Sequence, residues 1–147
     1  MNQQILKSIL DTLNAASADI CASVLMTKEG LVLVGASPQA QPARGYDEDR
    51  ISALSASILL LGHKFMDEFV GDELDQVLIK SKGGYLLAIL GKDLALTVLA
   101  KPYAESGLIF SQMALVVDNL MPVFCEQTLK MPTDGLERVF NGLVAKA

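Results

Sequence analysis

The sequence predicts an α+β fold: a five-stranded antiparallel sheet with the central helix on one face and the N- and C-terminal helices on the other. Five short apolar segments, several of them joined by tight glycine-containing turns, indicate strands that lie antiparallel to their neighbours. Three longer segments repeat apolar residues every three or four positions, which is the spacing of a helix. The 147 residues fit one main domain, which we place at residues 1–121, followed by a C-terminal helical extension at residues 122–147.

The first helix and the first hairpin follow from local patterns. Residues 2–16 carry one apolar stripe at helical spacing, made of Ile5, Leu6, Ile9, Leu10 and Leu13. The segments 20–27 and 31–36 are mostly apolar, and Lys28-Glu29-Gly30 between them places a glycine where a turn needs a positive φ. We therefore expect two strands joined as a β-hairpin.

The segment from Asp49 to Phe69 is expected to be a helix with two separate apolar or small-residue stripes. The large-residue stripe contains Ile51, Leu54, Ile58, Leu61, Phe65 and Phe69, and we expect it to lie on the chain's own sheet. The small-residue stripe, roughly a third of a turn away, contains Ser52, Ser55, Ala56, Leu59, Gly62, His63 and Met66. Small residues let two helix backbones come close, so we predict that this stripe contacts a second copy or another partner. Burial inside a larger monomer is the alternative.

Three more strands follow the central helix. Residues 37–47 form a loop before it, and Asp47 and Asp49 are candidate N-caps. After the helix we expect strands at residues 73–82, 85–90 and 94–100, with tight glycine-containing turns between them.

The chain ends in helical segments. A long helix is expected from Tyr103 to about Leu120, Pro122 breaks or kinks it, and residues 123–130 are a candidate second helical segment. A short amphipathic helix follows at residues 136–144. Because an isolated helix of this length is unstable, it must dock on the chain itself, on its dimer mate or on another partner.

Composition and charge disfavour several classes of partner. The apolar runs fall far short of the ~18 residues that a membrane span requires. The net charge is −5 and the basic residues are scattered, so we do not expect nucleic acid as a partner. The N-terminus lacks the pattern of a secretory signal, and Cys21 and Cys125 stand far apart, which favours reduced thiols in a cytoplasmic protein.

The sequence shows no constellation of residues that would carry catalysis. His63 is the only histidine, and together with two distant cysteines it does not make a metal site. The glycines near Gly83-Gly84 and Gly91-Lys92 lack the spacing of a phosphate-binding loop. We therefore expect neither enzyme activity nor a metal or cofactor.

Three segments resemble the roadblock family, which includes the roadblock-type dynein light chains and bacterial regulators of Ras-like GTPases. They are the hairpin Thr27-Lys28-Glu29-Gly30-Leu31, the central-helix segment LSASILLLG, and the three strands that end in LTVLAKP and are followed directly by a helix. The resemblance covers roughly residues 1–120. It implies a homodimer in which two sheets join edge to edge and two central helices pair. The edge strand would span residues 74–82 and pair through Leu74, Gln76, Leu78 and Lys80.

The resemblance also implies a partner and a mechanism. Bacterial family members bind a small Ras-like GTPase and stimulate GTP hydrolysis without inserting an arginine, and neither Arg44 nor Arg50 stands out here as such a residue. We therefore expect a non-catalytic homodimeric regulator that binds a small Ras-like GTPase and modulates GTP hydrolysis or nucleotide state. A light-chain-type structural adaptor or scaffold in a larger complex is the alternative. A ligand-sensing domain is a weaker third hypothesis, because no polar cluster suggests a lined pocket.

Overall fold

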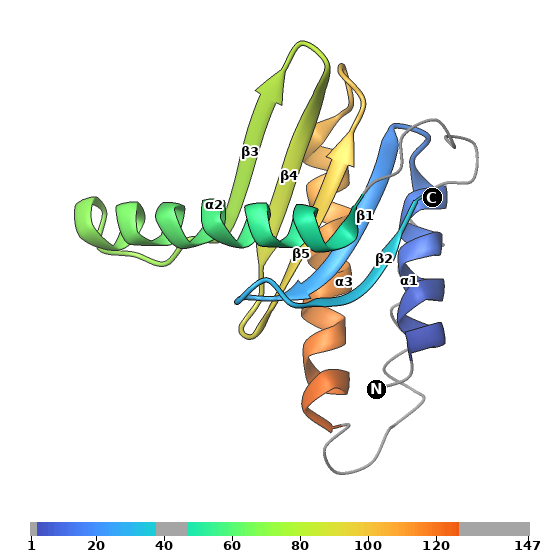
Figure 1. Ribbon diagram of the computed structural model, residues 1–147, viewed down its shortest axis with the longest axis horizontal. Helices are drawn as coiled ribbons and strands as arrows, with labels where there is room; N and C mark the ends of the chain where they lie inside the picture. Colours follow the sequence, from blue (N-terminus) through green and yellow to red (C-terminus); the bar gives the residue numbers. More distant parts are fainter. Residues whose placement is uncertain (1–2, 38–46, 127–147) are drawn as a thin grey trace.

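The computed structural model describes residues 3–37 and 47–126, and these ranges contain three helices and five strands. In chain order they are α1 (Gln3–Ala16), β1 (Ile20–Thr27), β2 (Val32–Ala36), α2 (Glu48–Phe69), β3 (Gln76–Ser81), β4 (Gly84–Leu90), β5 (Leu94–Ala100) and α3 (Ser106–Glu126). Figure 1 shows α2 on one face of the sheet and α1 and α3 on the other. The predicted fold class is confirmed.

The strands form one sheet in the order β2-β1-β5-β4-β3, and each neighbouring pair is antiparallel. The last of the described strands, β5, lies in the middle of the sheet, where Thr97 is level with Val24 of β1 and with Ala88 of β4. The two hairpins, β1–β2 and β3–β4, are therefore joined only through β5. Within the described strands, β2 and β3 form the edges.

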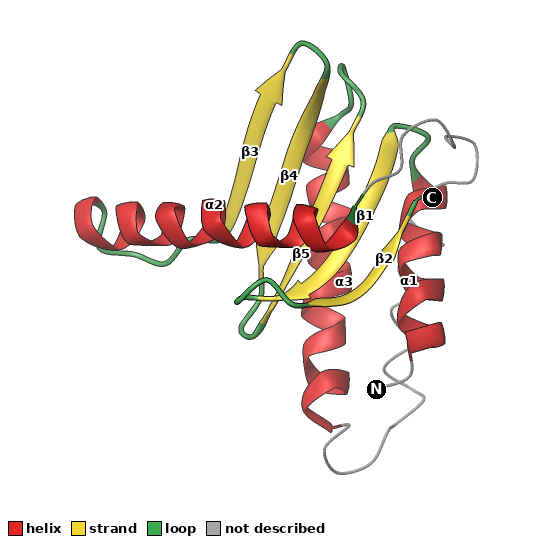
Figure 2. Ribbon diagram, viewed as in Figure 1, coloured by secondary structure: helices red, strands yellow, loops and turns green. Residues whose placement is uncertain are grey.

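The main core consists of side chains from the sheet and from the helices α1 and α3, which cover the same face of the sheet (Figure 2). The apolar stripe predicted for α1 is buried there, and one polar pair crosses the layer, because Ser23 Oγ donates a hydrogen bond to Asn14 Oδ1 (2.9 Å). Full burial of one large apolar side chain contributes about 1.5–3 kcal/mol, and this layer holds most of the buried apolar side chains. Its fully buried helix residues include Ile9, Leu10, Leu13, Ile109, Met113 and Val116.

The helix α3 differs from the prediction at both of its ends. It begins at Ser106 because Tyr103 has a φ of 72°, a left-handed conformation that ends the preceding turn instead of starting a helix. It continues through Pro122 to Glu126, since a proline removes one backbone hydrogen bond without necessarily ending a helix. The domain boundary at residues 121–122 stays a prediction, and the short helix expected at 136–144 lies outside the described residues.

The helix α2 has well-defined ends. The side chain of Asp47 caps its start, where Oδ1 accepts a hydrogen bond from the Arg50 N–H (3.3 Å), and Glu48 and Asp49 add negative charge to the first turn. Its end is marked by Gly71, which has a φ of 78° and donates to the Met66 carbonyl (2.8 Å). Between these ends α2 runs across the strands, and its C-terminal half extends beyond the edge strand β3 (Figure 1).

The prediction of which α2 stripe lies on the sheet was wrong. Ser52, Ser55 and Leu59 of the small-residue stripe are buried, whereas most of the large-residue stripe is exposed. The reason lies in the β1–β2 turn, which approaches α2 closely. A Cβ atom added to Gly30 would lie 3.1 Å from the Ala56 Cβ, and Ser52 Oγ donates a hydrogen bond to the Gly30 carbonyl (2.8 Å). Only small side chains therefore fit on the face of α2 that contacts the β1–β2 turn.

Candidate self-association surface

The exposed stripe of α2 is the largest apolar feature on the surface of the helix. Leu54, Leu61, Phe65 and Phe69 are each 59–70% exposed, while Ile51 and Ile58 are half-buried. The rings of Phe65 and Phe69 contact each other, with centroids 5.0 Å apart. Large apolar residues gathered in this way on a surface are typical of a protein-binding site.

The edge strand β3 lies under this helix and adds a second element to the surface. One side of β3 has no neighbour among the described strands, so its backbone N–H and C=O groups are available for pairing there. Leu78 and Ile79 are 37% and 43% exposed. Of the residues predicted for edge pairing, Gln76, Leu78 and Lys80 lie in β3 and are exposed, whereas Leu74 precedes the strand and is half-buried against α2 near Gly62.

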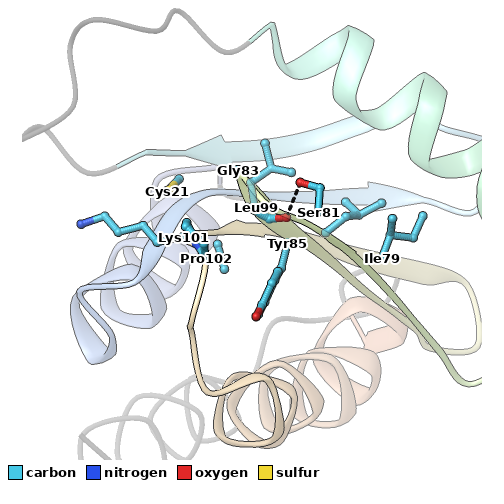
Figure 3. A pocket seen from close by; sticks show the side chains of 11 residues that line it. Cys21, Ile79, Ser81, Gly83, Tyr85, Leu99, Lys101 and Pro102 are labelled. Atoms are coloured by element: carbon cyan, nitrogen blue, oxygen red, sulfur yellow. Dashed lines mark hydrogen bonds between the residues drawn. The ribbon is translucent and has the colours of Figure 1, made fainter.

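A shallow hollow of about 630 Å³ continues the surface at the end of the sheet that α2 leaves uncovered (Figure 3). Its apolar wall comes from Ile79, Leu86 and Leu99, which are level with one another on β3, β4 and β5. By strand alternation they face the same side as Ala88, which packs in the cluster under α2. Tyr85 points to the opposite side, toward α3 (Figure 3).

Charge is distributed unevenly along the edge. Three carboxylates, those of Asp72, Glu73 and Asp75, lie just before β3, and two lysines, Lys80 and Lys82, lie at its other end. Lys101 lines the hollow at that same basic end, and none of the described residues lining the hollow is acidic. The edge thus has an acidic start and a basic end.

The residues of the small-residue stripe, which were predicted to form the interface, differ in their exposure to solvent. Ser52, Ser55 and Leu59 are buried against the chain's own sheet, and Ala56, Gly62 and Met66 are half-buried; His63 is exposed. A partner contact through this stripe stays a prediction, and His63 is its exposed residue, whereas the exposed large apolar side chains lie on the large-residue stripe.

Several residues of this surface were not singled out from the sequence. Leu86, Leu99, Lys82 and Lys101 come together only because the register aligns the ends of β3, β4 and β5. A strand that is apolar throughout, such as residues 85–90, does not reveal which of its faces is covered. The uneven charge of residues 72–82 is the sequence feature that could have indicated this surface.

The described residues contain neither a side-chain cluster that could hold a metal ion nor a helix that could span a membrane. Among them, no group of three or more His, Cys, Asp or Glu side chains is placed to hold a metal ion. None of the helices, over the same residues, is long and apolar enough to cross a membrane.

Comparisons with known proteins agree with this architecture. A sequence model of the Roadblock/LC7 domain matches residues 7–100. The Roadblock/LC7 domain from Streptomyces avermitilis superposes with a TM-score of 0.71 at 21% identity, covering 81% of this chain and 97% of its own. MglB from Myxococcus xanthus gives 0.73 at 18% identity, covering 88% and 93%. The gliding protein MglB from Thermus thermophilus gives 0.64 at 12% identity, covering 99% and 92%. Curated protein sequences yield no match.

Proposed function

The chain belongs to the Roadblock/LC7 domain family, and we propose on that basis that it is a non-catalytic regulator of a small Ras-like GTPase that works as a homodimer. The observation that carries the proposal is the set of exposed apolar side chains on α2 and on the edge strand β3, together with the hollow at the end of β3. This surface is suited to a second copy, and the regulatory role follows from the resemblance to the bacterial regulators in the family.

An antiparallel pairing of β3 with the β3 of a second copy brings complementary surfaces together. The helix α2 passes the start of β3, where Gly62 lies close to Leu74 and Val77. The start of an antiparallel neighbour lies beside the end of this strand, which is where the hollow is found. The overhanging half of one α2, with Phe65 and Phe69, would therefore cover the Ile79–Leu86 wall of the other copy.

The charge distribution favours the same orientation. In an antiparallel pair, the carboxylates before one β3 lie beside Lys80 and Lys82 of the other copy. A parallel pair would place acid beside acid and base beside base, which is unfavourable. The charges on the edge therefore select one of the two possible orientations.

We propose that the dimer acts on the GTPase by fixing its geometry. An arginine finger raises the rate of GTP hydrolysis by about 10³–10⁵-fold, so the loss of such an arginine is easy to detect. Arg50 is exposed in the first turn of α2 and is the arginine to test. We expect Arg50→Ala to keep any stimulation within about twofold of the parent, far from an arginine-finger loss.

The decisive experiment mixes the full chain with a small Ras-like GTPase from the same genome. Phosphate release is followed in single turnover, and binding is measured with GDP and with a non-hydrolysable GTP analogue. We expect faster release or binding that depends on the nucleotide. The absence of both contradicts the regulatory role, and stable binding without either effect favours the adaptor function.

A further inference from the structure

We infer that the flank of α2 facing the β1–β2 turn carries a docking site for a protein segment that presents an aliphatic side chain beside a carboxylate. A hollow of about 230 Å³ lies there, lined by Lys28, Leu59, Leu60, His63 and Leu90. These residues come from three places: the turn after β1, the middle of α2 and the end of β4. Neither the self-association surface nor the GTPase proposal uses them.

The turn that carries Lys28 is fixed against the helix. The Thr27 side chain accepts a hydrogen bond from the Leu31 N–H (3.1 Å), and the Gly30 N–H donates to the Thr27 carbonyl (3.0 Å). Ser52 Oγ of α2 then holds the Gly30 carbonyl at 2.8 Å. The backbone under Lys28 therefore has a set position relative to His63, which lies about three turns along the same helix from Ser52. A site built on a fixed frame loses less conformational entropy on binding.

The lining selects the occupant by its chemistry. Leu59 and Leu90 offer apolar contact, and Leu60 stands at the rim with 62% of its surface exposed. The polar lining groups are the Lys28 ammonium and the His63 imidazole, and none of the described lining residues is acidic. A lysine ammonium, which can pair with an anion, and an imidazole N–H, which can donate a hydrogen bond, together complement a carboxylate.

The size of the hollow indicates a side chain instead of a free metabolite. Pockets that enclose small-molecule ligands usually measure about 300–1,000 Å³, and this one is smaller. It suits a single aliphatic side chain with its acidic neighbour held at the rim by Lys28 and His63.

The site is separate from the surface proposed for the second copy. Leu60 and His63 lie on the flank of α2 that lines this hollow with Lys28, whereas Leu61 and Phe65 are roughly 100° or more away around the helix. A dimer would leave this hollow open in both copies. The inference therefore rests on the fold alone and does not require that the partner be a GTPase.

The test selects phage-displayed random peptides that bind the full chain. Peptides that also bind the Lys28→Glu, His63→Ala double variant are then removed. We expect the surviving peptides to share a Leu, Ile or Val next to Asp or Glu. Their affinity should fall at least tenfold on Lys28→Glu and several-fold on His63→Ala. Lys92→Glu is the matched control, since this exposed lysine lies in the nearby β4–β5 turn but does not line the hollow.

Three results would overturn the inference: no peptide survives the depletion, the survivors lack acidic residues, or Lys92→Glu weakens binding as much as Lys28→Glu. Circular dichroism and sedimentation of each variant confirm that fold and association are unchanged, because the substituted side chains are exposed. The experiment measures peptide binding and not GTP hydrolysis, so its result is independent of the regulatory proposal.

Discussion

At the scale of single residues, small side chains determine how α2 sits on the sheet. The hydroxyl of Ser52 is fully buried and lies within hydrogen-bonding distance of two carbonyls, those of Gly30 (2.8 Å) and Asp49 (2.9 Å). Ala56 leaves room for the backbone of Gly30. A larger residue at either position would lift the helix off the turn, so both residues serve the packing of α2 within the chain.

The hydrogen bond from Ser52 can be tested against a surface serine on the same helix. We expect Ser52→Ala to lower the free energy of unfolding by about 1 kcal/mol, because the Gly30 carbonyl loses its partner. Ser57→Ala is the control, since the exposed Ser57 Oγ bonds only to Ala53 within the helix and should change stability by less than about 0.5 kcal/mol. Urea denaturation measures both values. Equal effects would show that the contact between helix and turn is not stabilising.

Two glycines separate backbone strain from steric crowding. Gly30 has a φ of 97° and a crowded Cβ position, whereas Gly71 has a φ of 78° and no atom within 4 Å of its Cβ position. We expect Gly71→Ala to destabilise by about 1 kcal/mol through strain alone. Gly30→Ala should be worse by a further 1 kcal/mol or so through overpacking. Thermal unfolding compares the two, and a Gly30→Ala variant as stable as Gly71→Ala would contradict the close approach of the turn.

At the scale of elements, the sequence patterns identified the strands and helices but not every face. The α1 stripe was correct because its other residues are polar, so only one side could be buried. The helix α2 has two candidate faces, and periodicity favours the larger side chains. The actual choice depends on Gly30, which is more than twenty positions away in sequence and reaches Ser52 only in the folded sheet. The hollow beside β3 could not be foreseen for the same reason, since it depends on register.

The β3 edge permits a test of orientation by charge reversal. One variant carries Lys80→Glu and Lys82→Glu, and the other carries Asp72→Lys and Asp75→Lys. Each alone should self-associate about tenfold more weakly, because two copies then place like charges together and surface pairs are worth about 0.2–1 kcal/mol each. Mixed in equal amounts, the two variants should form a heterodimer, since one edge is acidic and the other basic.

Sedimentation equilibrium at low and high salt measures the effect, and salt should reduce the differences. Failure of the mixture to associate better than either variant would exclude antiparallel β3 pairing as the orientation.

At the scale of the whole molecule, the chain exposes apolar residues that its own core does not need. Phe65 contributes to the surface of α2 and Ser55 to its contact with the sheet. We expect Phe65→Glu to give a folded monomer. We expect Ser55→Arg to lower the free energy of unfolding by about 3 kcal/mol or more, because a charge would be buried without a partner. Lys64→Glu, an exposed charge change on the adjacent residue, should leave both fold and association intact.

Sedimentation and circular dichroism distinguish these outcomes. A folded dimeric Ser55→Arg variant would show that the small-residue stripe is not on the sheet. A dimeric Phe65→Glu variant would remove the large-residue stripe from the interface.

The central position of β5 has a consequence for how the protein is made. A ribosome delivers both hairpins before the strand that connects them, and an isolated hairpin is marginally stable in water. Until residue 100 has emerged, the nascent chain therefore holds two unconnected half-sheets with apolar faces exposed to solvent. Folding of the sheet then requires contacts between distant segments, such as that of Thr97 with Val24, which slows it. A chain arrested before residue 94 is accordingly the form most exposed to aggregation and to capture by chaperones.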